Sequence, residues 1–262
     1  PTAGEIARTH SMPGLPDGIV IAGIAGDQQA ALFGQACFGV GDAKCTYGTG
    51  AFVLVNAGSQ PVVSRSGLLS TVGWQIGPDV VYALEGSSFI AGAAVQWLRD
   101  GLGLIASASE VETLAASVDS SDGVSFVPAI CGLTRGSTRA HLARATLEGI
   151  ALSVNDLLGA MAADLGEPLG RMRVDGGAAA NDLLMQFQSD VGNLVVERPS
   201  ELESTARGAA MLAGIGAGLF RTGADASQMI TVDRTFQPSM AEAVRSERLA
   251  GWRDAVRRSR SV

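Results

Sequence analysis

The sequence predicts an α/β domain, and three observations support that prediction. Short β-branched runs alternate with longer helical patterns along the chain. A Gly-Thr-Gly turn at residues 48–50 separates two strand-like runs, which is typical of a hairpin. The chain has 262 residues, of which 47% are hydrophobic, so it is long enough to bury a sizeable core.

The first strand and helix place a carboxylate at the break between them. The run Ile19–Ala22 is β-branched and bounded by glycines, which predicts a buried strand, and the residues from Ala30 onward suit a helix. Asp27 then lies at the helix N-terminus, beside Gln28. An Asp in this position is most often a cap that accepts backbone N–H bonds. A strand end with a carboxylate and amides can also hold a polyhydroxy ligand and accept its proton, and the residues alone leave both interpretations open.

The hairpin at residues 42–56 has two open interpretations as well. A dinucleotide-binding turn is excluded, because Val53 occupies the position of the third glycine and β-branched residues follow where a helix is required. Gly48 and Gly50 suit a plain tight turn, whereas the Thr49 hydroxyl and nearby N–H groups suit a phosphate cradle.

Further strands and helices follow in alternation. Residues 68–71 and 80–84 predict strands, and residues 85–98 predict a helix in which Gly92 and Gln96 share one face. The clearest helix spans residues 141–164, with Glu148 and Asp156 off its apolar stripe and therefore expected in solvent. Residues 171–181 predict a strand that ends in a glycine turn, followed by a helix to residue 191. Such a turn is either an ordinary connection or a close approach to a nucleotide.

Composition excludes several classes of function. A net charge of -7 argues against a nucleic-acid partner, and no apolar run is long enough to span a membrane. Three scattered cysteines favour free thiols in a cytoplasmic protein rather than a disulfide framework. With only two histidines and no Cys-x-x-Cys motif, neither a His-based triad nor a multi-histidine metal site is expected.

The segment Gly23–Gln35 closely resembles the second domain of the FGGY family of carbohydrate kinases, its glycerol kinases in particular. The family residue that matches Asp27 is the general base, and the one that matches Gln28 helps to hold the polyol. The hairpin is similar to the family's phosphate-binding hairpin, in which the residue matching Thr49 contacts phosphate and the one matching Phe52 lines the polyol site.

Other segments resemble nucleotide-binding motifs. Residues 91–93 and 96–100 match the family pattern, and residues 171–181 resemble the adenosine motif of the actin, hexokinase and Hsp70-like ATPases. The resemblance implies that the nucleotide is bound by Thr49, Gly50, Gly92, Gln96, Gly177 and Asn181.

The resemblance implies a ribonuclease-H-like domain with a mixed sheet flanked by helices, formed by residues 19–262, after a lead-in or interdomain linker at residues 1–18. The implied reaction is phosphorylation of glycerol by ATP, with Asp27 as the base and Mg²⁺ bridging the ATP oxygens. The implied partners are an N-terminal domain and further copies in a homo-oligomer. The family's first phosphate loop, Asp-x-Gly-Thr-Thr, is not found here, so we expect the 262 residues alone to be nearly inactive.

Two matters stay open at this point. Only Ile130 and Cys131 stand where glycerol kinases carry a longer loop with a Gly-Ala-Pro-Tyr-Trp signature, which indicates a deletion, an engineered change or a segment left out. Two other functions also remain: a kinase for another polyol or sugar such as xylulose, or a non-catalytic nucleotide-binding or oligomerisation module.

Overall fold

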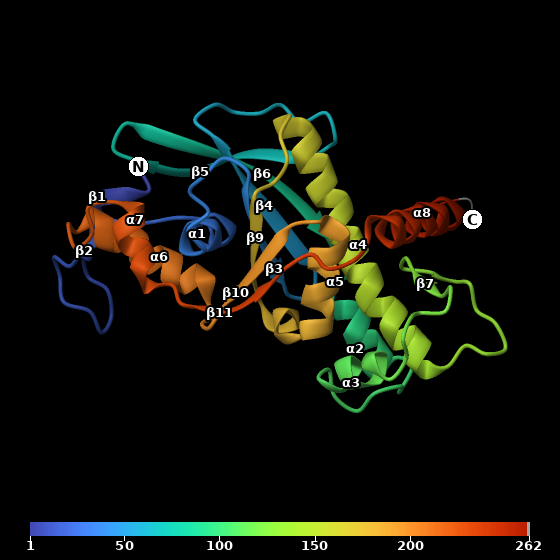
Figure 1. The fold of residues 1–262 in the computed structure, drawn as a ribbon. Helices are drawn as coiled ribbons and strands as arrows, with labels where there is room; N and C mark the ends of the chain where they lie inside the picture. Colours follow the sequence, from blue (N-terminus) through green and yellow to red (C-terminus); the bar gives the residue numbers. More distant parts are fainter. Residues whose placement is uncertain (261–262) are drawn as a thin grey trace.

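A mixed nine-stranded sheet runs through the centre of the computed structural model, which describes residues 1–260 (Figure 1). Its strands lie in the order β11-β10-β9-β3-β4-β6-β5-β1-β2, and a separate two-stranded hairpin is formed by β7 and β8. The strands are β1 (Ala3–Arg8), β2 (Val20–Gly23), β3 (Asp42–Tyr47), β4 (Ala51–Gly58), β5 (Leu69–Ile76), β6 (Asp79–Ser88), β7 (Ser125–Phe126), β8 (Ile130–Cys131), β9 (Arg171–Asp175), β10 (Val195–Pro199) and β11 (Val232–Phe236).

Helices cover both faces of this sheet. In Figure 1, α1, α6 and α7 gather on one side of it, and α2, α3, α4, α5 and α8 on the other. Their bounds are α1 (Asp27–Gly34), α2 (Gly92–Asp100), α3 (Glu110–Ala116), α4 (Arg139–Leu165), α5 (Asp182–Gly192), α6 (Ser204–Gly216), α7 (Gly223–Ala226) and α8 (Glu242–Ser259), with short 3₁₀ turns at Gly177–Ala180 and Ser227–Met229. Within residues 1–260, no helix combines the length and the apolarity that crossing a membrane requires.

Each face of the sheet has its own hydrophobic core, because side chains alternate between the faces along a strand. Cys45 and Tyr47 of β3 join the larger core under α4 and α5. Phe33 of α1 and Trp74 of β5 belong to the smaller core, where their rings meet edge to face at 5.1 Å. The two cores fix α1 and α4 on opposite faces of β3 and β4.

The predicted hairpin at residues 42–56 is confirmed, since β3 and β4 pair antiparallel from Ala43 with Val55 to Tyr47 with Ala51. The helix predicted at residues 85–98 begins later than expected. β6 continues to Ser88 because Ser87 and Ser88 pair with β4, and α2 starts only at Gly92.

The N-terminal residues differ from the prediction in two ways. Within the expected lead-in at residues 1–18, Ala3–Arg8 forms β1, which pairs with β2 and with the end of β5. The strand predicted at Ile19–Ala22 is present as β2, but it is not buried: Val20 and Ile21 are more than a third exposed because β2 is the last strand of the sheet. Whether a domain boundary lies near residue 18 stays a prediction.

The long helix α4 confirms the predicted apolar stripe, since Leu147, Ile150 and Val154 are buried. Asp156 is exposed as expected, and it accepts a hydrogen bond of 2.8 Å from the indole of Trp252. The expectation for Glu148 is wrong, because this side chain is buried. It forms ion pairs with Arg144, four residues before it on α4, and with Arg248 on α8.

Two glycines allow α1 and α6 to cross in direct backbone contact. A Cβ at Gly208 of α6 would overlap the carbonyl oxygen of Ala30 and would lie 2.8 Å from the nitrogen of Gly34. A Cβ at Gly34 would overlap the carbonyl oxygen of Ser204. No flexible side chain stands between the two backbones, so neither position tolerates a larger residue without moving a helix.

We therefore expect Gly208→Ala to lower the free energy of unfolding by about 1–3 kcal/mol or more, because the new methyl group forces the helices apart. Urea unfolding followed by circular dichroism measures the change. Gly159→Ala on the exposed side of α4 is the matched control: a Cβ there meets nothing within 4 Å, and removing a helical glycine gains about 0.5–1 kcal/mol. Equal stability of the two variants would contradict the proposed helix crossing.

Candidate active site

Asp27 is the first residue of α1, and its side chain is exposed. The N-cap of this helix is Gly26, which makes no side-chain cap. Asp27 accepts the backbone N–H of Gln28 at 2.8 Å through Oδ1, so one carboxylate oxygen is held by the first turn. Thr205 of α6 donates its hydroxyl to the carbonyl oxygen of Asp27 at 3.4 Å. The carboxylate is thus anchored at the start of a helix and still open to a ligand.

A row of side chains crosses the sheet on the face that α1 and α6 cover. Asp175 of β9 lies opposite Thr46 of β3, Thr46 opposite Phe52 of β4, and Phe52 opposite Ser87 of β6. Residues that face each other across paired strands point to the same side of the sheet. The half-buried ring of Phe52 therefore shares a face with Thr46 and with Lys44, which is hydrogen-bonded to α1.

Lys44 is the residue that joins this row to α1. Its ammonium group donates to the side-chain oxygen of Gln28, and to the hydroxyl of Thr46 at 2.9 Å. Burial lowers the pKa of Lys44, and the nearby carboxylate of Asp175 opposes that shift. Asp175 is itself buried and accepts hydrogen bonds from Gln35 at 3.0 Å and from the hydroxyl of Ser204.

A cavity of about 390 Å³ opens on the other face, at the ends of the same strands. It brings together five of the six residues predicted to bind nucleotide: Thr49, Gly92, Gln96, Gly177 and Asn181. Its walls include apolar side chains from α2, α3, α4 and α5, namely Val95, Val111, Leu147 and Leu184. The volume and the mixture of apolar walls with a few polar groups are typical of a small-molecule site.

Asp27, Gln28 and Phe52 do not line this cavity, and neither does Gly50. Gly50 is buried at the hairpin tip, where a Cβ would lie 2.7 Å from the carbonyl oxygen of Ser88. The need for glycine at this position is explained by close packing, and its predicted nucleotide contact stays a prediction.

The hairpin tip is held by the first residues of α2. The carbonyl oxygen of Thr49 accepts the N–H groups of Ala91 and Ala93 at 3.0 Å, and that of Gly48 accepts the N–H of Gly92 at 3.0 Å. A Cβ at Gly92 would lie 2.5 Å from the same Gly48 oxygen. Gly92 is therefore required for the packing of the helix against the hairpin, and its predicted nucleotide contact stays a prediction. The Thr49 side chain remains exposed.

Asn181 and Gly177 form the opposite rim of the cavity. The side-chain oxygen of Asn181 accepts the N–H of Leu184 at 2.8 Å and caps α5, which leaves the amide nitrogen as a donor. Gly177 is exposed, and a Cβ there would meet nothing within 4 Å. Unlike Gly50 and Gly92, Gly177 has no packing partner that demands a glycine.

Several site residues were not singled out from the sequence, although two of them lie inside segments that were. Lys44 and Asp175 are such residues on the α1 face, as is Glu112 at the cavity, which accepts the N–H of Leu183 at 3.0 Å. Lys44 could have been found from composition, because it is the chain's only lysine and it stands inside a strand. Asp175 directly precedes the glycine turn that the sequence did single out.

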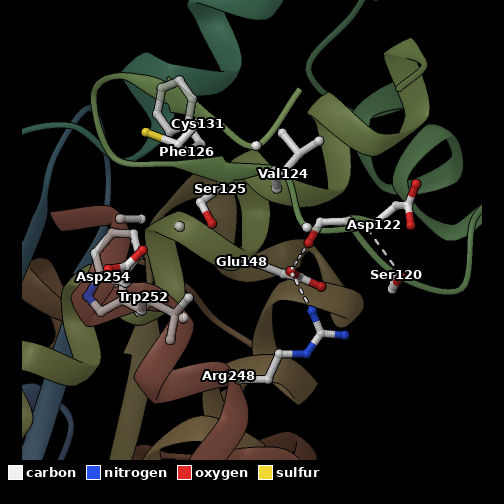
Figure 2. Close-up of a pocket in the computed structure, with 18 of the residues that line it drawn as sticks. Ser120, Asp122, Val124, Ser125, Phe126, Cys131, Glu148, Arg248, Trp252 and Asp254 are labelled. Atoms are coloured by element: carbon white, nitrogen blue, oxygen red, sulfur yellow. Dashed lines mark hydrogen bonds and ion pairs between the residues drawn. The ribbon is translucent and has the colours of Figure 1, made fainter. Parts of the chain in front are cut away.

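A second cavity of about 520 Å³ lies between the β7–β8 hairpin, α4 and α8 (Figure 2). Glu148 points toward Arg248 there and also accepts a hydrogen bond of 2.9 Å from Ser121. Cys131 lines this cavity at the position of the unusually short loop. None of the residues predicted for catalysis or nucleotide binding lies in it.

Solved structures of carbohydrate kinases share the arrangement of sheet and helices. Glycerol kinase from Plasmodium falciparum, solved with ADP, has a TM-score of 0.87 at 37% identity, covering 92% of this chain and 52% of that one. Xylulose kinase from Rhodospirillum rubrum has a TM-score of 0.82 at 25% identity, covering 97% and 55%. The predicted ribonuclease-H-like fold, that of the actin, hexokinase and Hsp70-like ATPases, is confirmed.

Residues 43–217 match the profile of the FGGY family of carbohydrate kinases, C-terminal domain, and the chain belongs to this family. The glycerol kinase of Bdellovibrio bacteriovorus is 51% identical over 275 aligned positions, which cover 98% of this chain and 56% of that protein. The chain thus spans about half the length of the curated relatives it matches. Because the alignment has more positions than the chain has residues, the relative carries extra residues within the aligned region.

Two thiols lie in the cores beside the site. Burial raises the pKa of Cys37 and of Cys45 to about 12 in each case. The thiolate is the reactive form of cysteine, so both groups stay protonated and inert near pH 8. Cys131 is half-buried at β8.

We expect Ellman's reagent at pH 8 to label one thiol rapidly in the native protein and all three in guanidinium chloride. The native reactivity of Cys37 and Cys45 should rise only as the pH approaches 12, because the folded state holds their protons. Cys131→Ser, the control, should remove the fast reaction. Fast labelling of two or more thiols in the native protein would contradict the burial of Cys37 and Cys45.

Proposed function

We propose that this chain is the C-terminal half of an ATP-dependent glycerol kinase, which converts glycerol to glycerol 3-phosphate. The observation that carries the proposal is the position of an open, helix-anchored carboxylate, Asp27, on one side of β3 and β4, with a ligand-sized cavity at the ends of the same strands. Identity of 51% to a glycerol kinase over nearly the whole chain supports glycerol as the substrate.

On the acceptor side, Asp27 is the general base. Its exposed carboxylate takes the proton of the attacking hydroxyl, a role that carboxylates commonly fill when they lie within hydrogen-bond reach of the substrate. Gln28 holds a neighbouring hydroxyl through its amide. Phe52 offers an apolar surface to the carbon skeleton of the polyol.

On the donor side, the cavity holds the nucleotide. The apolar walls contact the base and ribose, and the amide of Asn181 and the open surface at Gly177 accommodate the rest of the adenosine moiety. The hydroxyl of Thr49, at the tip of the hairpin, donates to the phosphate. Gln96, exposed on the same cavity wall as Gly92, adds a second amide.

Mg²⁺ fits this site as an ion that is bound chiefly through ATP. It prefers hard oxygen ligands, which the phosphate oxygens of ATP provide, and among the described residues no cluster of three His, Cys, Asp or Glu side chains could hold it. When bound, it would neutralise charge that develops on the transferred phosphoryl group.

The remaining half of the enzyme would be an N-terminal domain that supplies the first phosphate loop and further polyol contacts. A chain that spans about half the length of its relatives supports this proposal. We place the enzyme in the cytoplasm, in a homo-oligomer.

The alternative substrate class is a sugar such as xylulose, because a xylulose kinase has a similar fold. Assays of the two-domain enzyme with glycerol, xylulose and related polyols side by side distinguish the two classes.

In that two-domain enzyme, Asp27→Asn should lower kcat for glycerol by about 10²–10⁴-fold, because the amide cannot accept the hydroxyl proton. The KM for ATP should change little, since Asp27 lies outside the nucleotide cavity. A coupled assay of ADP release measures both constants. Asp79→Asn, which changes an exposed Asp at the start of β6, is the matched control and should retain full activity. Normal turnover by the Asp27 variant would instead favour a non-catalytic module.

Gly177→Leu should fold normally, because its side chain enters open space, yet raise the Kd for ADP by about tenfold or more by filling the cavity. Isothermal calorimetry with ADP gives the constant directly. Gly159→Leu, also open to solvent but remote from the cavity, should bind like the wild type. Unchanged affinity in the Gly177 variant would place the nucleotide elsewhere.

A further inference from the structure

Lys44 differs from every other basic side chain of this protein. The sequence holds 19 lysines and arginines, and Lys44 is the only lysine among them. It lies inside β3 with an exposed fraction of 0%. A buried ammonium group is costly unless it is paired and hydrogen-bonded, so its contacts show what holds it there.

The ammonium group has direct contact with the residues of the acceptor side. It donates to the side-chain oxygen of Gln28, and to Thr46 at 2.9 Å. Lysine can only donate hydrogen bonds, so whichever group of the Gln28 amide faces it must be the oxygen. The amide nitrogen then faces the other way, toward Oδ2 of Asp27 at 3.5 Å.

The charge of Lys44 is also favoured by a nearby buried carboxylate. Asp175 is the first of the charges that favour its protonated form. That carboxylate is fixed by Gln35 at the end of α1 and by Ser204 at the start of α6. Hydrogen bonds therefore join Lys44 to Gln28 and Gln28 to Asp27, and the nearby charge of Asp175 favours the ammonium form of Lys44.

We propose that Lys44 is a positioning residue for phosphoryl transfer: it fixes the orientation of the Gln28 amide, so that its N–H groups face Asp27 and the incoming hydroxyl. The inference rests on the function proposed above. With the amide locked, the polyol meets a donor from Gln28 and an acceptor from Asp27 in a fixed arrangement. Without Lys44, the amide can rotate and present its oxygen beside the Asp27 carboxylate, which repels it.

The alternative is that Lys44 serves only to stabilise the fold. The two roles differ in a double-mutant cycle, because a residue that acts through Gln28 has no further effect once the Gln28 amide is gone. A purely structural residue would act independently of Gln28.

The test compares Lys44→Met, Gln28→Leu and the double variant in the two-domain enzyme. Methionine keeps the length and apolar stem of lysine and removes its charge and donors. We expect Lys44→Met to lower kcat/KM for glycerol by about 10–100-fold, as small misplacements of reacting groups do, with the KM for ATP within about twofold. The double variant should be no worse than Gln28→Leu alone. Additive losses in the cycle would overturn the proposal.

A matched control removes a different buried polar side chain from the same sheet. Asn56 on β4 is buried and bonds to the carbonyl oxygen of Cys37 and the N–H of Gly58, away from Gln28. Asn56→Leu should leave kcat/KM for glycerol unchanged, whatever its effect on stability. An equal loss in Asn56→Leu and Lys44→Met would assign the effect of Lys44 to folding and so overturn the proposal.

A spectroscopic measurement keeps the proposal testable if Lys44→Met fails to fold. Because the chain has one lysine, ¹³Cε-lysine labelling of the 262-residue protein gives a single side-chain signal. The chemical shift of this signal should change in Gln28→Leu and not in Asn56→Leu. An unchanged chemical shift in Gln28→Leu would contradict the contact between Lys44 and Gln28 and so overturn the proposal. Failure of the proposed function looks different: the wild-type enzyme would not phosphorylate glycerol, or Asp27→Asn would remain active, while the lysine signal would still respond to Gln28.

Discussion

The backbone contact between α1 and α6 sets the position of the candidate base. α1 has only eight residues, too few to be stable without tertiary contacts. Gly34 and Gly208 let α6 approach it closely, and the buried guanidinium of Arg207 donates at 2.9 Å to the carbonyl oxygen of Gly34 at the end of α1. A cation at that end also interacts favourably with the helix dipole. The start of α1, with its carboxylate, is held in place because its end is fixed.

The alternation of side chains along β3 divides the chemistry between the two faces of the sheet. Lys44 and Thr46 point toward α1, where the acceptor site is proposed, whereas Cys45 and Tyr47 point into the core under α4. Tyr47 also lines the proposed nucleotide cavity and donates to the buried Gln188 at 2.8 Å. The proposed donor and acceptor sites are thus supported by neighbouring residues of one strand, which would keep their separation constant.

Local patterns were sufficient to predict most of the fold and to select the two sides of the site. The strand-to-helix break at Asp27, the hairpin and the apolar stripe of α4 each lie within a short stretch of sequence, so periodicity and turn residues reveal them. Features made by distant residues were missed. Glu148 is buried because Arg248, on a helix one hundred residues further on, pairs with it, and β2 is exposed because of its place in the strand order.

The glycines show most clearly what a sequence motif cannot predict. Gly50, Gly92 and Gly177 all belong to segments predicted to bind nucleotide, but the first two are required by packing and only Gly177 faces open space. A motif identifies the position of the glycine, but it does not show whether the glycine is needed for close packing or for contact with a ligand. Contact with a ligand is therefore better argued from the absence of a packing partner than from the presence of glycine.

The hydrogen bonds at the start of α2 leave its first N–H groups unable to bind a phosphate. A helix N-terminus is ordinarily a good phosphate site, because its first N–H groups are free. Here the N–H groups of Ala91, Gly92 and Ala93 are already given to the carbonyl oxygens of Gly48 and Thr49. They stabilise the hairpin that presents the Thr49 hydroxyl, and so they are not available to a phosphate. The proposed phosphoryl transfer would then need charge stabilisation from groups other than these three, and the N-terminal domain proposed above is one source of them.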